Sequence, residues 1–178
     1  LRENAAKYKL NPDAVGAWGS SAGGHLVALL GTTADVTELE ADAKTSSRVQ
    51  AVCDFFGPTD FAQMNAQAKV KGPIDHDSPT APEAKLIGGA VPANAEKAQK
   101  ANPVGYVTKD DAPFLILHGD ADPLVPPGQS ELLNDALTKA GVESTLIVVP
   151  GVGHDARVGA GENADKIVAF FDKHLKGK

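Results

Sequence analysis

Residues 14–30 read AVGAWGSSAGGHLVALL, and this stretch decides the fold that we expect. The apolar run Ala14–Trp18 predicts a strand, the run from residue 25 onward predicts a helix, and Gly-x-Ser-x-Gly lies between them. A serine in that setting stands on a sharp, strained turn, so Ser21 should be exposed above a sheet. We expect that Gly19 and Gly23 are glycines because a β-carbon at either position would collide where strand and helix approach.

This turn favours a nucleophilic role for Ser21. It would leave backbone N–H groups free at a helix N-terminus, where a developing negative charge is stabilised. A purely structural turn is the alternative, because small residues occur in many turns. The predicted strand before the motif and the predicted helix after it favour the nucleophile.

Further runs of the same kind extend the pattern along the chain. The predicted strands are Ala14–Trp18, Val49–Phe56, Pro113–His118 and Thr145–Val149. Helices are predicted over residues 1–8, Leu26–Gly31, Gln129–Gly141 and Ala164–Leu175, the last stopping near Gly177. Strands that alternate with helices imply an α/β fold, in which a mostly parallel sheet is flanked by helices and reactive groups gather at the carboxyl ends of the strands.

The helical patterns place apolar side chains on the predicted helices. In the helix predicted over Gln129–Gly141, one face carries Leu132, Leu133, Ala136, Leu137 and Ala140. In the first predicted helix, Leu1, Ala5 and Tyr8 share one face. The last carries the apolar residues Ile167, Val168, Phe171 and Leu175. At 178 residues the chain is long enough to bury a core, and we expect one domain over residues 1–178.

Residues 57–109 differ from the rest because they contain six prolines among short helix-prone pieces and show no strand pattern. We interpret this segment as a long excursion between the second and third strands, packed over the site. It would either shape a substrate pocket or merely cover the sheet, and long connections without strands are often functional.

Composition narrows the possible partners. The net charge of −6 and the lack of any basic run argue against nucleic-acid binding, because phosphate contacts need clustered Lys and Arg. No stretch approaches the roughly 18 apolar residues of a membrane span. The single cysteine, Cys53, lies in a buried-strand pattern and is interpreted as an inert core thiol. No Cys/His spacing typical of metal ligands occurs, so we expect neither a metal nor another cofactor.

A serine nucleophile needs a base and a group that orients that base. His154 follows the fourth predicted strand in the glycine-flanked loop Gly-Val-Gly-His, and Asp122 follows the third. The order Ser, Asp, His, each just past a strand, is the order that an α/β-hydrolase requires. Asp120 is the alternative acid, although it immediately follows the strand and is placed to brace the turn. Asp155 is too close to His154 in sequence to orient its ring.

The other histidines have simpler interpretations. We expect His25 to cap or pack within the first long helix and His118 to bond to the turn after its strand. His76 and His174 occur in polar contexts that predict exposure.

Five stretches together resemble the esterase and lipase branch of the α/β-hydrolase superfamily. They are WGSSAGGHL at residues 18–26, FFGPTD at 55–60, LIGG at 86–89, HGDADPLVP at 118–126 and GVGH at 151–154. The chain is most similar to small bacterial carboxylesterases related to hormone-sensitive lipase and to feruloyl and acetylxylan esterases. The resemblance runs in order along nearly the whole chain.

This resemblance implies that Ser21 is the nucleophile, Asp122 the orienting acid and His154 the general base. It also implies that the backbone N–H of Ala22 donates to the oxyanion. Val125 is expected to line the acyl pocket from its place beside Asp122.

The family places four strands and a His-Gly-Gly loop before the nucleophile strand, and this sequence has neither. We therefore expect an N-terminally truncated part of such an enzyme, whose first strand is an exposed edge prone to pair with another chain. Loss of an oxyanion donor costs on the order of 100–1,000-fold in turnover.

The function that follows is hydrolysis of small-to-medium acyl esters, with a small-molecule ester as the partner. One alternative is a serine peptidase that resembles the prolyl oligopeptidase group, which shares the triad order. The other is a catalytically weak fragment that only binds or assembles.

Overall fold

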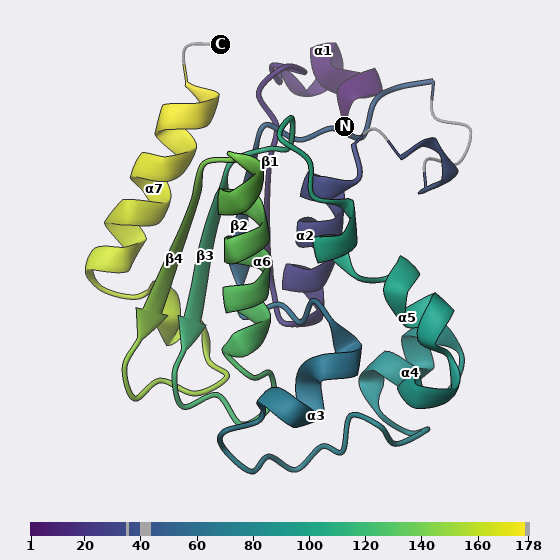
Figure 1. Cartoon of the computed structure of the whole chain (residues 1–178). Coiled ribbons are helices and arrows are strands. Elements are labelled where there is room, and N and C mark those ends of the chain that lie inside the picture. Colours follow the sequence, from purple (N-terminus) through teal and green to yellow (C-terminus); the bar gives the residue numbers. More distant parts are fainter. Residues whose placement is uncertain (35, 40–43, 177–178) are drawn as a thin grey trace.

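The computed structural model describes residues 1–34, 36–39 and 44–176, and a four-stranded sheet forms its centre (Figure 1). The strands are β1 (Gly16–Ser20), β2 (Ala51–Phe55), β3 (Phe114–Gly119) and β4 (Ser144–Val149). They lie side by side in chain order and every pair is parallel. All four carboxyl ends therefore point to one edge of the sheet. The predicted α/β architecture is confirmed.

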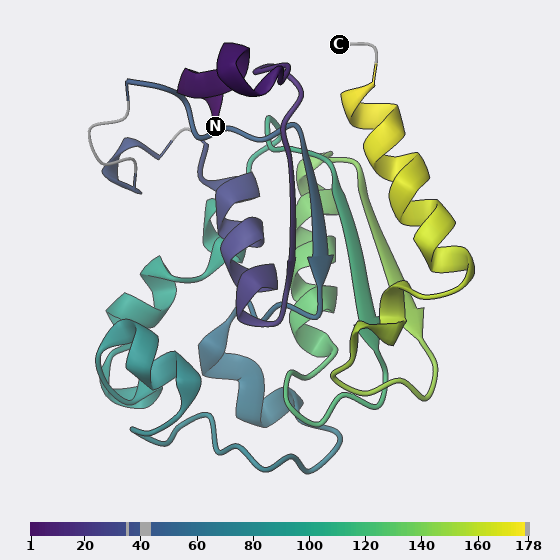
Figure 2. The ribbon, with the colours of Figure 1, turned by 180° about the vertical axis from the view of Figure 1, so that it is seen from behind.

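Helices cover both faces of this sheet. On one face lie α2 (Ala22–Thr32) and α6 (Gly128–Ala140), which pack on strand residues such as Val52 and Ile116. On the other face lies α7 (Glu162–Leu175), which packs on the next residue of each strand, Cys53 and Leu117 (Figure 2). Successive strand side chains point to opposite faces. The two central strands, β2 and β3, are buried on both faces, as their continuous apolar sequences predict.

The predicted face of the first helix is wrong, and only part of the apolar set of the last helix is buried. In α7, Ile167 and Phe171 pack into the core together with Phe170, whereas Val168 is 60% exposed. At the start of the chain a 3-10 turn, η1 (Arg2–Asn4), leads into a short helix, α1 (Ala5–Tyr8). Leu1 and Tyr8 are exposed there, and only Ala5 of the predicted face is buried. The predicted helix stop at Gly177 lies outside the described residues.

The segment 57–109 contains only short helices and turns among the described residues. They are η3 (Phe61–Gln63), α3 (Met64–Gln67), α4 (Pro82–Ile87), η4 (Val91–Ala93), α5 (Ala95–Lys100) and η5 (Pro103–Tyr106). The segment contributes Phe61, Met64 and Val91 to a small core that also contains Val125 from the loop after β3. Figure 1 shows α3 and α4 beyond the carboxyl ends of the strands. Two further 3-10 turns, η2 (Thr37–Leu39) and η6 (Ala156–Gly159), lie elsewhere. No helix in the described ranges is long and apolar enough to cross a membrane.

Strand β1 is the edge of the described sheet and pairs only with β2 there. Its side chains are exposed or half-buried, and Trp18 is 57% exposed. We propose that this edge pairs with another chain, because unpaired strand edges are templates for association. Light scattering should then give a mass above that of one chain, and Trp18→Lys should lower it. A stable, soluble monomer would argue against the proposal.

Candidate active site

Ser21 stands at the turn between β1 and α2 in a strained backbone conformation. Its φ of 56° with a ψ of −123° lies outside the regions that non-glycine residues favour, which costs on the order of 1–3 kcal/mol. The Ser21 N–H donates to the Phe55 carbonyl at 2.9 Å, so the neighbouring strand holds the turn. The predicted strained turn is confirmed, although β1 runs two residues further into the motif than the apolar run indicates.

The close approach at this turn depends on Gly19 and Gly24 rather than on Gly19 and Gly23. A β-carbon at Gly19 would overlap the Gly23 carbonyl, as predicted. A β-carbon at Gly23 would meet nothing within 4 Å, so the prediction for Gly23 is wrong. At Gly24 a β-carbon would overlap Asp54 Oδ1 and lie 2.8 Å from Gly57 Cα. The helix therefore touches the chain after β2 one residue later than expected.

These contacts predict opposite effects for two neighbouring substitutions. Gly24→Ala should lower the free energy of unfolding by about 1–3 kcal/mol, because backbone and a buried carboxylate must move. Gly23→Ala should be neutral or raise it by up to about 1 kcal/mol, since alanine is the better helix former. Urea unfolding of both variants measures the difference. Equal losses in both would contradict the packing described here.

The structure brings Ser21, His154 and Asp122 together at the carboxyl edge of the sheet. His154 Nε2 lies 2.8 Å from Ser21 Oγ, and His154 Nδ1 lies 2.7 Å from Asp122 Oδ2. Because the carboxylate accepts, Nδ1–H donates to it and Nε2 is left to accept the serine proton. Phe56 packs on the imidazole with ring centroids 4.4 Å apart. Sequence reasoning missed this contact, in which Phe56 itself has a positive φ of 43°.

The Asp122 carboxylate is fully buried and held as an anion. Its Oδ1 accepts from the backbone N–H groups of Leu124 at 2.8 Å and Val125 at 2.9 Å. Burial alone would raise the pKa of Asp122, but the hydrogen bonds from His118, His154 and these two N–H groups outweigh it. The pKa of Asp122 therefore lies well below its usual value, and the carboxylate stays charged at neutral pH.

Its neighbours fill the roles that the sequence suggests. His118 is buried and its Nε2 donates to the Val125 carbonyl at 2.9 Å, with Asp122 Oδ2 3.4 Å away. Asp120 accepts from the Gly151 N–H at 2.7 Å and so braces the loop that carries His154. Asp155 caps η6 through the Arg157 N–H.

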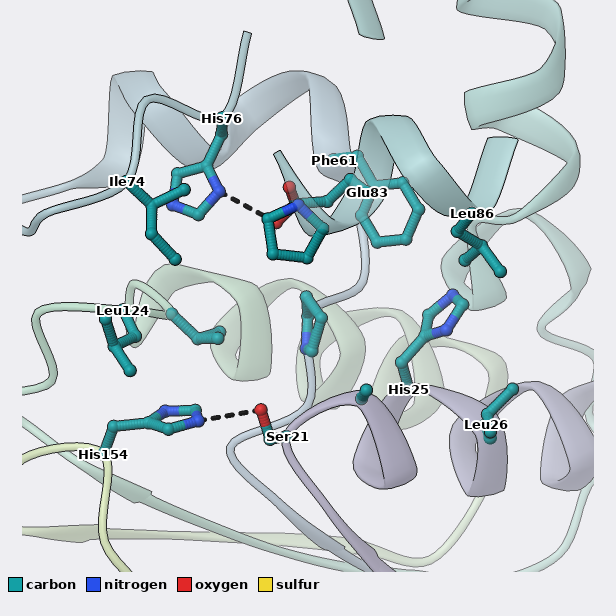
Figure 3. Close-up of a pocket in the computed structure, with 14 residues that line it drawn as sticks. Ser21, His25, Leu26, Phe61, Ile74, His76, Glu83, Leu86, Leu124 and His154 are labelled. Carbon is teal, nitrogen blue, oxygen red and sulfur yellow. Dashed lines mark hydrogen bonds and ion pairs between the residues drawn. The ribbon is translucent and has the colours of Figure 1, made fainter. Parts of the chain in front are cut away.

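A cavity of about 370 Å³ opens over Ser21 (Figure 3). Ala22, whose N–H is the first of α2, and Val125 both line it, together with His154. The rest of the lining is mostly apolar, and half of the lining residues come from the segment 57–109: Pro58, Phe61, Ile74, His76, Pro82, Glu83 and Leu86. No group of three or more potential metal ligands occurs within residues 1–34, 36–39 and 44–176.

Three further histidines, His25, His76 and His174, have little exposed surface. His25 is buried and its Nε2 donates to the Ala101 carbonyl at 2.7 Å, which ties α2 to the end of α5. Burial lowers the pKa of His25 more than this bond raises it. The prediction of exposure is wrong for His76, which is 4% exposed and lines the cavity. It is also wrong for His174, whose side chain packs against Phe170 and is 12% exposed.

Two neighbouring buried groups of β2, Cys53 and Asp54, have raised pKa values. Burial and the neighbouring Asp54 raise the pKa of the Cys53 thiol to about 12, which confirms an inert core thiol. Burial raises the pKa of Asp54 to about 6, although the Gly57 N–H and His118 oppose the shift. Because the folded-state pKa is raised, the ionised Asp54 costs stability above about pH 6, and that cost is relieved as the pH falls towards 4.

The chain is similar to several known esterases. A family model described as BD-FAE matches residues 1–137. Esterase LipQ of Mycobacterium tuberculosis is 31% identical over 143 residues, which are 79% of this chain and 32% of LipQ. A solved structure described as a truncated form of a carbohydrate esterase from gut microbiota is 34% identical, with a TM-score of 0.86 over 98% of this chain and 64% of that one. The bifunctional GH43-CE protein of Bacteroides eggerthii is 37% identical, with a TM-score of 0.87 over 98% of this chain and 23% of that one.

The chain thus spans about a third of the length of LipQ. The family match nevertheless covers most of this chain, from its first residue through β1, β2, β3 and most of α6. The chain belongs to the BD-FAE family, and with it to the carboxylesterase and lipase branch of the α/β-hydrolase superfamily.

Proposed function

We propose that this protein hydrolyses carboxylic esters through an acyl-serine intermediate. The observation that carries the proposal is the pair of contacts at His154, with Ser21 Oγ 2.8 Å from one ring nitrogen and Asp122 Oδ2 2.7 Å from the other. Nucleophile, base and orienting acid in hydrogen-bond contact are the arrangement that activates a serine hydroxyl. The esterase names of the relatives support the same reaction class.

In this mechanism Ser21 Oγ attacks the ester carbonyl while His154 Nε2 takes its proton. The negative charge that develops on the carbonyl oxygen is stabilised by the backbone N–H of Ala22 at the start of α2. His154 then returns the proton to the leaving alcohol, and Asp122 stabilises the charged ring throughout. Water repeats the sequence on the acyl-enzyme and releases the acid.

The cavity supports small-to-medium acyl groups as substrates. At about 370 Å³ it is at the small end of the range for ligand pockets, and apolar side chains dominate its lining. We propose that Val125 contributes to the acyl-binding surface and that residues 57–109 form the cover of this pocket. A small-molecule ester is then the partner that the site accepts.

Turnover of p-nitrophenyl acetate and butyrate compared with turnover of peptide p-nitroanilides tests the proposed reaction class. We expect ester cleavage at rates well above those for the anilides, because a cavity of about 370 Å³ suits a short acyl group better than a peptide. Preferential cleavage of the anilides would identify a peptidase. No turnover of either, with a folded protein, would identify a fragment that only binds or assembles.

A further inference from the structure

The roof of the cavity contains one buried polar pair that the proposed mechanism does not use. His76 Nδ1 and Glu83 Oε1 lie 2.8 Å apart, and the two side chains are 5% and 6% exposed. Glu83 lies in the first turn of α4, and His76 precedes that helix in the loop after α3. Both residues line the same cavity as Ser21, and Figure 3 shows the pair across the cavity from the serine.

This pair leaves hydrogen-bonding capacity unused. Glu83 Oε2 is buried without a hydrogen-bond partner among the described residues. Because His76 Nδ1–H donates to Glu83 Oε1, a ligand in the cavity would meet the other ring nitrogen, Nε2. A buried polar pair that is only partly hydrogen-bonded is costly in an apolar wall, and polar groups placed in apolar pockets usually orient a ligand.

Several contacts hold His76 in this position. Its backbone N–H donates to Asn65 Oδ1 at 3.0 Å, and the Asn65 amide donates to Asp75 Oδ1 at 2.9 Å. The loop is thus fastened to α3 while Glu83 holds the ring from α4. A ring fixed from both sides is preorganised for binding, because little freedom is lost when a ligand arrives.

The position of the pair indicates which part of an ester it would meet. Figure 3 shows His76 on the same side of the cavity as His154, whereas Leu26 and Leu86 lie on the other side, beyond Ser21. His154 returns its proton to the leaving alcohol, so the alcohol part of the ester lies next to His154. His76 therefore faces the alcohol part.

We propose that His76, oriented by Glu83, binds a free hydroxyl group on the alcohol part of the ester. With Nδ1–H donated to Glu83, Nε2 is the ring nitrogen that can accept a hydrogen bond from the hydroxyl group. His76 is then a substrate-binding residue, and Glu83 is a positioning residue that acts through it. The proposal rests on the proposed ester hydrolysis only for the assignment of the alcohol side.

Four matched esters test it: cyclohexyl acetate and its 2-, 3- and 4-hydroxy derivatives, each of which adds one hydroxyl group to the parent ester. Their dissociation constants are measured by NMR titration on the Ser21→Ala protein, which does not need to turn them over. We expect at least one hydroxy ester to bind about 10-fold more tightly than cyclohexyl acetate, the gain typical of one well-placed hydrogen bond. Equal affinities for all four esters would overturn the proposal.

Substitutions then assign the preference to the pair. In the double variant His76→Phe, Glu83→Leu, the affinities for the preferred hydroxy ester and for cyclohexyl acetate should become about equal. This double variant leaves no buried charge unpaired. Glu83→Gln keeps an acceptor for Nδ1–H and should keep most of the preference, whereas Glu83→Leu should lose most of it. An unchanged preference in the double variant would also overturn the proposal. Leu86→Ala, on the far side of the cavity, is the matched control. It should weaken binding of the preferred hydroxy ester and of cyclohexyl acetate by the same factor.

The same esters separate this proposal from the proposed function. In the wild-type protein, kcat/KM for the preferred hydroxy ester should exceed that for cyclohexyl acetate about 10-fold, mainly through KM, and the double variant should remove the difference. A hydroxyl preference in binding with no turnover would refute the ester hydrolysis and leave the binding role standing. Turnover of the esters without any preference for a hydroxy ester would refute the binding role of His76 and leave the ester hydrolysis standing.

Discussion

Replacing Ser21 with alanine should lower kcat/KM for p-nitrophenyl acetate by on the order of 10⁴-fold or more, to the residual rate of a protein without its nucleophile. The hydroxyl that receives the acyl group is then missing, and His154 Nε2 has nothing to deprotonate at 2.8 Å. Fold and cavity should be unaffected, because Ser21 Oγ makes no other hydrogen bond among the described residues. Steady-state release of p-nitrophenol measures the change.

Ser20→Ala is the matched control for this substitution. Ser20 is the neighbouring hydroxyl, it ends β1 and it is exposed. Its removal should change kcat/KM by less than a few-fold. If Ser21→Ala hydrolyses the ester as fast as the wild type does, the proposed nucleophile is wrong and the chain only binds or assembles.

Asp122→Asn should have the second-largest effect, a fall in kcat of about 10³–10⁴-fold with little change in KM. Asp122 Oδ1 accepts hydrogen bonds from two backbone N–H groups, so in the variant the asparagine side-chain oxygen must take the place of Oδ1. The amide NH₂ then takes the place of Oδ2 and points its hydrogens at His154 Nδ1. The ring must shift its proton to Nε2, where it can no longer accept the serine proton.

Asp120→Asn provides the comparison. Asp120 accepts a single backbone N–H, from Gly151, and an asparagine oxygen serves equally well. Its kcat should stay within a few-fold of the wild-type value. A large loss of kcat in Asp120→Asn together with a small loss in Asp122→Asn would show that Asp120, and not Asp122, orients His154.

The same carboxylate predicts a pH dependence of stability. The folded-state pKa of Asp122 lies below its ordinary value, so its contribution is fully present above about pH 4, the unfolded-state pKa, and is lost as the pH falls towards the folded-state pKa. The difference in unfolding free energy between wild type and Asp122→Asn should therefore be constant from about pH 5 to 8 and shrink below about pH 4. Urea unfolding across this range measures it.

Much of the site could be predicted from sequence because its residues follow local rules. Ser21 and His154 lie in glycine-rich turns directly after strands, and parallel strands bring their carboxyl ends to one edge. Asp120 and Asp122 could be distinguished because the first immediately follows β3 and braces a turn. Each of these predictions needed only the chain near the residue and the order of the strands.

Other features depend on contacts between distant segments, which no local pattern encodes. His76 occurs in the polar run Asp-His-Asp-Ser and reads as exposed, yet Asn65 and Glu83 enclose it from two helices. The role of Gly24 depends on Asp54 and on the chain after β2. The predicted contact at Gly23 failed for the same reason, since the position of α2 over the sheet sets which glycine is crowded.

The buried face of α7 shows a different limit. Ile167, Phe170 and Phe171 share one face, because residues three and four positions apart in a helix lie on the same side. Val168 lies about 100° around the helix from Ile167 and is exposed, so a list of the apolar residues without their helical spacing does not identify the buried face.

The activation of Ser21 by His154 is tested most directly by covalent labelling with a fluorophosphonate probe, followed by intact mass measurement and identification of the labelled peptide. We predict one adduct per chain, on Ser21, that is absent in Ser21→Ala and slowed strongly in Asp122→Asn. A folded protein that takes no adduct, or takes it at another residue, would contradict the proposed triad.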